Sequence, residues 1–145
     1  MGADHGGFAL KERVKEWLTE WGYAWEDLGN TEHREDDDYP QFAFAVGENV
    51  GRQEDARGIL GCRSAGGMVI AANKAKGARA VNVHDVKSAV HARENNNANI
   101  AVLSGDWLEE EEAKKILKTF LKTEFTGEER HKRRIKQIEE YEKTP

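Results

Sequence analysis

Cys62, the single cysteine of the chain, stands where the sequence offers the most chemistry. It ends the apolar run 59–62, and the small and polar residues 63–67 that follow open a predicted helix. At the end of a parallel strand, a thiol in this position faces backbone N–H groups and the positive end of a helix dipole. Because both favour the thiolate, we expect the pKa of Cys62 to be lowered. Two interpretations stay open: a catalytic base or nucleophile, or a small buried residue that ends a core strand.

Helices and strands alternate along the chain. Apolar residues at helical spacing predict helices over 10–21, 39–50, 68–74, 86–94, 109–121 and 128–142, and short apolar runs predict strands over 23–28, 59–62, 78–83 and 100–103. This alternation predicts an α/β fold, a three-layer Rossmann-like parallel sheet with helices on both faces. Only three residues precede Asp4, so the first strand is expected to be truncated.

The loops that follow the strands are the predicted ligand-binding segments, because ligands of such sheets bind outside the carboxyl ends of the strands. These loops comprise residues 4–7, 62–67, 84–85 and 104–106, and we expect all four to converge on one edge of the sheet. In the first loop, Asp4 and His5 precede two glycines, which allow the backbone to approach a ligand closely. The alternative for His5 is a purely structural histidine.

Composition narrows the class of protein further. A length of 145 residues suits one domain over 1–145. One cysteine excludes an internal disulfide and suits a reducing cytoplasm. A net charge of -5 argues against nucleic-acid binding, and no apolar run is long enough to cross a membrane. We therefore expect a soluble, cytoplasmic domain.

Five motifs, in order along the chain, resemble the type B ribose-5-phosphate isomerase family, which includes galactose-6-phosphate and allose-6-phosphate isomerases. They lie at residues 4–8, 38–40, 62–74, 93–99 and 130–135, so the resemblance runs from residue 2 to about residue 140. It implies aldose–ketose isomerisation of a sugar phosphate by proton transfer through a cis-enediolate, with no metal and no cofactor.

The same resemblance implies roles for residues 62–67, called the cysteine loop below. Cys62 is implied as the base that removes the proton beside the carbonyl, which agrees with its position over a strand end. Ser64 is implied to assist ring opening or to orient the sugar, with a helix N-cap as the alternative. Backbone N–H groups of the loop are expected to hold the enediolate oxygens, as in an oxyanion hole: those of Arg63, Ala65, Gly66 and Gly67.

The remaining predicted site residues lie elsewhere in the sequence. Asp4, His5 and Asn96 match sugar contacts of the family, although the run 95–97 also suits a helix C-terminus with turn-forming amides. Arg130 and Arg134 match its phosphate-binding pair, and residues four apart share one helix face. Their alternative is a solvated basic helix end. Because the family's arginines reach a neighbouring subunit's site, the resemblance implies at least a homodimer, with the helix over 128–142 packed on the partner.

Three positions depart from the family pattern. Arg63 stands where glycine is usual, Asn95 where many members carry histidine, and Asp106 where an arginine is common. We hypothesise that Arg63 supplies the positive charge that Asp106 cannot.

The sequence therefore predicts the interconversion of ribose 5-phosphate and ribulose 5-phosphate. One alternative is a hexose-6-phosphate isomerase of the allose or galactose type, and another is a non-catalytic domain that binds a phosphorylated metabolite. A response-regulator-like domain is disfavoured, because residues 36–38 lie in a loop before a helix rather than at strand ends.

Overall fold

The computed structural model describes residues 1–144. Its strands are β1 (Gly2–Ala3), β2 (Gly58–Cys62), β3 (Ala80–Asn82) and β4 (Ile100–Ser104). Its helices are α1 (Phe8–Glu20), α2 (Tyr39–Gly51), α3 (Gly66–Ala72), α4 (Val86–Asn96), α5 (Glu110–Lys122) and α6 (Glu129–Glu142). Each predicted helix is therefore present, with bounds that differ by a few residues.

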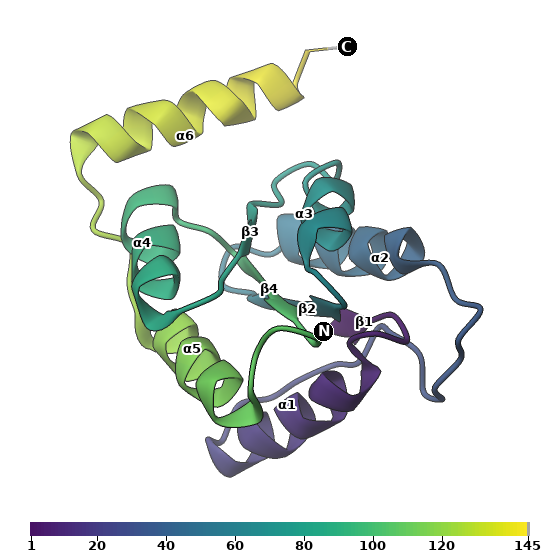
Figure 1. The fold of residues 1–145 in the computed structure, drawn as a ribbon. Coiled ribbons are helices and arrows are strands. Elements are labelled where there is room, and N and C mark those ends of the chain that lie inside the picture. Colours follow the sequence, from purple (N-terminus) through teal and green to yellow (C-terminus); the bar gives the residue numbers. More distant parts are fainter. Residues whose placement is uncertain (145) are drawn as a thin grey trace.

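The four strands form one parallel sheet in the order β1-β2-β4-β3 (Figure 1). Every residue of β2 and β4 is buried, as expected for parallel strands covered on both faces. Their register pairs Gly58 with Ile100 at one edge and Cys62 with Ser104 at the other. The carboxyl ends of β2 and β4 are thus level, and Cys62 lies at this carboxyl end of the sheet, called its carboxyl edge below.

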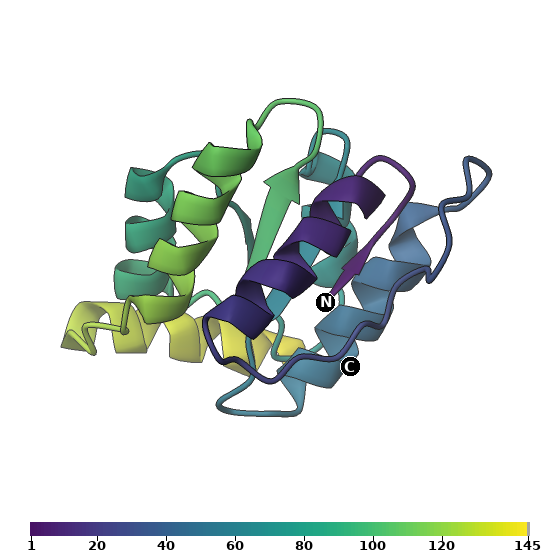
Figure 2. The same ribbon diagram turned by 90° about the horizontal axis from the view of Figure 1, so that it is seen from below.

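Alternation along β2 separates the two cores. Ile59 packs with residues of α1, α4 and α5 on one face, whereas Leu60 and Cys62 pack with α2 and α3 on the other. The helices therefore cover both faces of the sheet, as Figures 1 and 2 show. This confirms the predicted three-layer α/β fold.

Helix starts carry the local signals that place the connecting loops. Pro40 occupies the first turn of α2, where its missing N–H costs nothing. Asp85 caps α4, accepting the backbone N–H of Ser88, whose hydroxyl accepts the N–H of Asp85 in return. The glutamates that begin α5 complement the helix dipole.

The strand predicted over 23–28 is wrong. This segment runs beside β1 but makes only isolated contacts with it: Leu28 N–H donates to the carbonyl of Met1 over 2.8 Å, and the Met1 amino group donates to the carbonyl of Glu26. Since β1 comprises only two residues, it offers too short a partner for a ladder. The first strand is short, as predicted.

The last helix stands apart from the sheet, next to α4 (Figure 1). Buried Arg93 anchors the chain before it, donating through Nε to the carbonyl of Thr123 and through Nη1 to Asn97. On α6 itself, Ile138 and Tyr141 remain 51% and 81% exposed. An unpartnered helix with exposed apolar side chains is the kind of surface that a second subunit covers.

None of the helices within residues 1–144 is long and apolar enough to cross a membrane.

Candidate active site

Three of the four predicted loops meet at the carboxyl edge of the sheet. Asp4 N–H donates to the carbonyl of Gly61 over 3.3 Å, which ties the first loop to β2. Gly105 N–H donates to the carbonyl of Cys62 over 2.8 Å, which ties the last loop to the cysteine loop. Glycine is required where these backbones touch, because a Cβ on Gly7 would lie 2.2 Å from the carbonyl carbon of Gly61.

The fourth loop, residues 84–85, follows β3 and lies next to the loop that follows β4. His84 and Asp85 form the start of α4, where their backbone N–H groups bond Ser88. Since β3 pairs only with β4, this loop lies two strands away from β2, on the order of 10 Å. Because all four strands are parallel, residues 84–85 still lie at the same carboxyl end of the sheet as the other three loops, as predicted.

The thiol of Cys62 is buried, 5% exposed, and points to the α2–α3 face. Backbone N–H of Ala65 donates to Sγ over 3.1 Å. Ala65 adopts a left-handed conformation, φ 68°, which is uncommon for a residue with a side chain. It is the N-cap residue, directly before the first turn of α3. The loop thus wraps its own backbone around the sulfur.

The expected lowering of the Cys62 pKa is wrong. Burial, which disfavours the charged thiolate, raises its pKa, and the nearby carboxylate of Asp4 raises it further. The backbone N–H groups of Ala65, Met68 and Ser64 act in the opposite direction without prevailing. The free protein therefore holds Cys62 mainly as the neutral thiol near neutral pH, with the thiolate fraction growing as pH rises.

A substitution at Asp4 tests this explanation of the raised Cys62 pKa. Replacing Asp4 by Asn removes the charge that disfavours the thiolate, so the Cys62 pKa falls. The value of kcat/KM rises with pH as Cys62 becomes the thiolate. We expect the inflection of this rising limb to move to lower pH, whatever Asp4→Asn does to the absolute rate. Asp106→Asn is the matched control, because that exposed carboxylate is paired with Arg63 and should leave the inflection in place. An unmoved or higher inflection in Asp4→Asn would contradict the account.

Asp4 and His5 lie together at the end of β1. Asp4 is buried, its carboxylate accepts the N–H of Gly7 over 3.2 Å, and burial raises its pKa. His5 is partly buried, with its ring Nδ1 2.7 Å from the carboxylate of Asp37. Neither Asp37 nor this contact was predicted from the sequence, because the two residues are 32 positions apart.

Tyr39 is a second residue that sequence reasoning did not place. Its ring lies over Gly67, where an added Cβ would fall 2.6 Å from Tyr39 Cζ. Gly67 therefore admits the aromatic ring to the cysteine loop. Residues 38–40 are one of the five motifs of the family resemblance, but the Tyr-Pro pair by itself indicates only the start of a helix, so no role followed for Tyr39.

The exposed part of the cysteine loop carries Arg63 and Ser64. Arg63 Nη1 lies 3.5 Å from Asp106 Oδ2, so two of the three residues that depart from the family pattern are neighbours. Ser64 is exposed and does not cap α3, since the N-cap is Ala65 and no side chain bonds there. The alternative role of Ser64 as an N-cap is thus wrong.

Asn96 and Arg134 lie elsewhere, in a hollow of about 440 Å³ between α6, α4 and β3. His91, Asn95 and His131 also line it. His131 is buried, and its Nε2 has no hydrogen-bond partner within residues 1–144. A hollow with several nitrogen donors and an unsatisfied imidazole suits an anionic or hydroxylated ligand.

The neighbours of Asn96 have structural roles, as the helix-terminus interpretation predicted. Asn97 ends α4 in a left-handed conformation, φ 45°. Asn99 is buried, donates to the carbonyl of Gly77 and accepts the N–H of Arg79. Of the asparagine run, Asn95 and Asn96 face the hollow.

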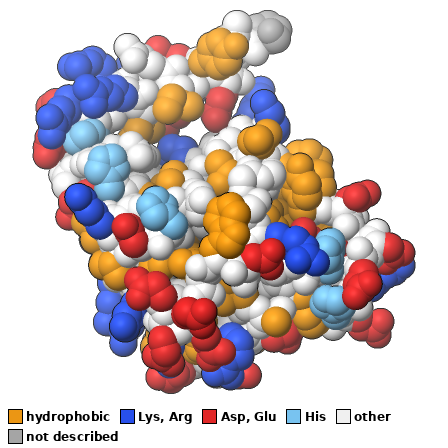
Figure 3. Space-filling view, viewed as in Figure 1, with side chains coloured by type: hydrophobic (Ala, Val, Ile, Leu, Met, Phe, Trp, Pro, Cys, Tyr) orange, Lys and Arg blue, Asp and Glu red, His pale blue; other side chains and the backbone are white. Residues whose placement is uncertain are grey.

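Arg130 does not line the hollow. Its guanidinium lies 2.9 Å from Glu128 and is exposed, at the start of α6. Arg134, one turn later, faces the hollow, and basic side chains gather over this part of α6, at the upper left of Figure 3.

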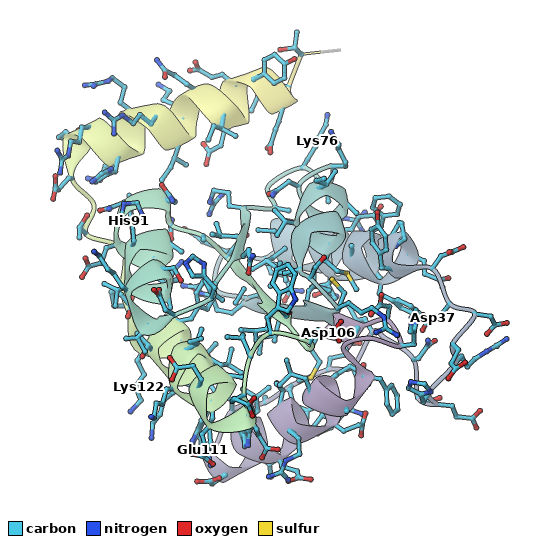
Figure 4. All side chains as sticks on the ribbon, viewed as in Figure 1. Asp37, Lys76, His91, Asp106, Glu111 and Lys122 are labelled. Carbon is cyan, nitrogen blue, oxygen red and sulfur yellow. The ribbon has the colours of Figure 1, made fainter. Side chains whose placement is uncertain are left out.

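One chain does not bring these two groups of residues together. Asn96 ends α4 at the edge where β4 begins, whereas Cys62 pairs with Ser104 at the edge where β4 ends. Five-residue strands put roughly 13 Å between these edges. Figure 4 shows the same separation, with His91 near α6 and Asp37 far from it across the molecule.

The first group has the parts needed for proton transfer. A buried thiol lies beside a buried carboxylate, backbone N–H groups surround the sulfur, and an imidazole stands at the end of the neighbouring strand. A base on a strand-end loop with clustered amides can remove a carbon-bound proton and stabilise the oxyanion that results. The second group offers cationic and amide nitrogens, which suit a phosphate and hydroxyl groups.

Comparison with known proteins gives a consistent result. A family model described as Ribose/Galactose Isomerase matches residues 1–138. The "Probable ribose-5-phosphate isomerase B" of Mycoplasma genitalium is 41% identical over 144 residues, covering 99% of this chain and 94% of the relative. The "Ribose-5-phosphate isomerase B" of Mycobacterium tuberculosis is 38% identical over 144 residues, covering 99% of this chain and 89% of the relative.

Solved structures agree. The ribose-5-phosphate isomerase B of Mycoplasma genitalium with bound ribulose-5-phosphate matches with a TM-score of 0.95 at 41% identity, covering 99% of this chain and 95% of that one. A ribose 5-phosphate isomerase of Thermotoga maritima matches with a TM-score of 0.90 at 42% identity, covering 96% of this chain and 94% of that one.

Proposed function

The chain belongs to the ribose/galactose isomerase family, and on that premise we propose that it interconverts ribose 5-phosphate and ribulose 5-phosphate. One observation carries the choice of substrate: the relative that matches 99% of this chain with a TM-score of 0.95 holds ribulose-5-phosphate. The comparisons favour an isomerase over a non-catalytic binding domain, because the relatives are named as isomerases.

Cys62 is the proposed base. Its thiolate removes the proton from C2 of the open-chain aldose, and the electron pair moves to the C1 carbonyl oxygen to give the enediolate. The hydroxyl proton on the C2 oxygen then passes to the C1 oxygen, and the thiol returns its proton to C1 as the C2 oxygen becomes the ketone, so no electron or atom is gained or lost. Backbone N–H groups of residues 63–67 stabilise the enediolate oxygens, and Ser64 assists ring opening or orients the sugar.

Asp4 and His5 orient the sugar from the neighbouring strand. Burial raises the pKa of both Asp4 and Cys62, and the negative charge of Asp4 raises the pKa of the thiol further. A raised pKa brings the Asp4 carboxyl closer to neutral pH, where such a group exchanges protons with a substrate more readily, whereas it keeps Cys62 mainly as the thiol until pH rises.

The second half of the site is proposed to come from a partner subunit. In a homodimer, the hollow of one protomer, with Asn96 and Arg134, lies against the Cys62 loop of the other and binds the phosphate and sugar, and Arg130, one turn before Arg134 on α6, reaches the phosphate from outside the hollow. The distance between the two groups in one chain, the exposed Ile138 and Tyr141 of α6, and the unsatisfied Nε2 of buried His131 support this arrangement. The single cysteine supports a cytoplasmic location.

Arg63 is proposed to contribute positive charge beside the cysteine loop. Its guanidinium is 64% exposed and Asp106 satisfies only part of it, so it remains available to a substrate oxygen. We expect Arg63→Ala to raise KM for ribose 5-phosphate about 10-fold, the effect of one charged hydrogen bond, with little change in kcat. Because exposed ion pairs contribute little to stability, the melting temperature should not change measurably. An unchanged KM would contradict the role.

A panel of sugar phosphates tests the proposed substrate. We expect kcat/KM to be highest for ribose 5-phosphate when ribose 5-phosphate, allose 6-phosphate and galactose 6-phosphate are compared under one set of conditions. A higher value for either hexose phosphate would transfer the assignment to the hexose-6-phosphate type.

A further inference from the structure

The carboxylate of Asp37 accepts more hydrogen bonds than any other group in the polar loop over residues 29–38, before α2. One oxygen accepts the backbone N–H of His5 over 3.0 Å and faces the ring Nδ1 of His5 at 2.7 Å. The other accepts the side-chain amide of Asn30 in a short hydrogen bond. The Asp37 side chain is only 5% exposed, whereas residues 31–36 are exposed. A buried carboxylate in an exposed loop is costly unless it is bonded, and here both oxygens are.

This arrangement determines which ring nitrogen of His5 carries the proton. A carboxylate at this distance accepts, so Nδ1 must carry a hydrogen, and in the neutral ring Nε2 is left as an acceptor. No residue within 1–144 hydrogen bonds Nε2 of His5, and the ring is 23% exposed. The loop of His5 touches the cysteine loop, since a Cβ on Gly6 would fall 2.9 Å from the backbone nitrogen of Arg63. The free nitrogen is therefore held at the edge of the proposed site.

A metal site is a poor interpretation of the same cluster. Asp4, His5 and Asp37 place one ligand atom each within 4.8 Å of the others. However, the Asp37 oxygens already accept three hydrogen bonds, and a protonated Nδ1 offers no lone pair to a cation.

We propose that Asp37 is a positioning residue for the isomerisation. It holds the His5 ring in the Nδ1–H form and in one orientation, so that Nε2 accepts a hydrogen bond from a sugar hydroxyl. Asn30 completes the bonding of the carboxylate and thereby links the polar loop to the site. This inference rests on the proposed function, because it assigns the role of Nε2 to a bound sugar phosphate.

The form of the ring can be measured without substrate. Nitrogen-15 chemical shifts of the His5 ring in the full-length protein distinguish Nδ1–H from Nε2–H. We expect Nδ1–H in the wild type and a shift toward Nε2–H in Asp37→Ala. Asp36→Ala is the matched control, because Asp36 lies in the same loop, is 76% exposed and pairs only with Arg34. A wild-type ring in the Nε2–H form, or one that Asp37→Ala leaves unchanged, would overturn the inference.

Kinetics test whether Asp37 acts through His5. We expect Asp37→Ala to lower kcat/KM about 10-fold, the lower end of what lost orientation of a functional histidine costs, and Asp36→Ala to leave it unchanged. In a His5→Asn background, Asp37→Ala should cause no further loss, since residues that act as one unit are not additive. Losses that multiply would overturn the inference. If Asp37→Ala does not fold, Asp37→Asn keeps the shape of the side chain and is compared in the same cycle.

The two proposals fail in different ways. A wild-type protein that converts none of the sugar phosphates overturns the proposed function. An active wild type whose kcat/KM and His5 ring form are unchanged by Asp37→Ala overturns only this inference.

Discussion

Cys62→Ala is expected to lower kcat for ribose 5-phosphate isomerisation by about 10²- to 10⁴-fold, the usual contribution of a general base. The thiol is the one group on the cysteine loop that can take a proton from carbon, and the loop amides that bind the enediolate remain in the variant. Because those amides and the sugar contacts are retained, KM should change little. Steady-state kinetics with ribose 5-phosphate measure both values.

Cys62→Ser separates the loss of the base from the loss of volume. Serine fills nearly the space of cysteine but is a far weaker acid, so this variant should also be inactive although its core is filled. Thermal unfolding of both variants checks that the buried position, 5% exposed, tolerates the change. A kcat above about a tenth of the wild-type value in either variant would rule out Cys62 as the base.

The second large effect concerns a site shared between subunits. We expect Arg134→Ala to lower kcat/KM by about 10- to 100-fold, since one charged hydrogen bond to phosphate is lost. Arg133→Ala is the matched control, because Arg133 is the exposed neighbour of Arg134 and does not line the hollow.

Mixing the two defective variants gives the sharper result. When Cys62→Ala and Arg134→Ala chains are co-expressed at equal levels, random pairing makes about half of the dimers mixed. In a shared-site dimer, each mixed dimer has one site with both defects and one with neither, so activity should recover to about a quarter of the wild-type value. If both halves of the site came from one chain, the mixture would show only the mean activity of the two variants. That outcome would contradict the shared site.

Much of the fold could be predicted because local signals agree with the tertiary structure. Pro40 marks the start of α2, and the apolar segments around Ile59 and Ile100 form the two fully buried strands. The failure at residues 23–28 has a long-range cause. The segment has the apolar character of a strand, but its neighbour β1 is too short to pair with it.

The electrostatics of Cys62 could not be predicted from residue types. Loop amides were expected to lower the pKa, and they do act in that direction, but burial and the charge of Asp4 outweigh them. The depth of the thiol depends on α2 and α3, which pack over it, and Asp4 is 58 positions away in the sequence.

The division of the site was partly available from topology. A helix that follows a parallel strand returns the chain to the opposite edge, so Asn96, at the end of α4, had to lie away from Cys62. In contrast, nothing in the sequence indicates that Asp37 bonds His5, because the polar loop has no regular structure from which to infer contacts. The neighbouring positions of Arg63 and Asp106 agree with the predicted convergence of their loops.

Solvent exchange tests the central claim most directly, because a proton that the Cys62 thiol holds between the two transfers can exchange with solvent deuterium and so label the product. In deuterium oxide, the wild-type protein should incorporate deuterium from solvent at C1 of ribulose 5-phosphate formed from ribose 5-phosphate, as mass spectrometry or proton NMR would show. Cys62→Ala, with its fold verified, should bind the sugar phosphate and incorporate none. Incorporation that persists in Cys62→Ala would contradict a mechanism in which Cys62 carries the proton.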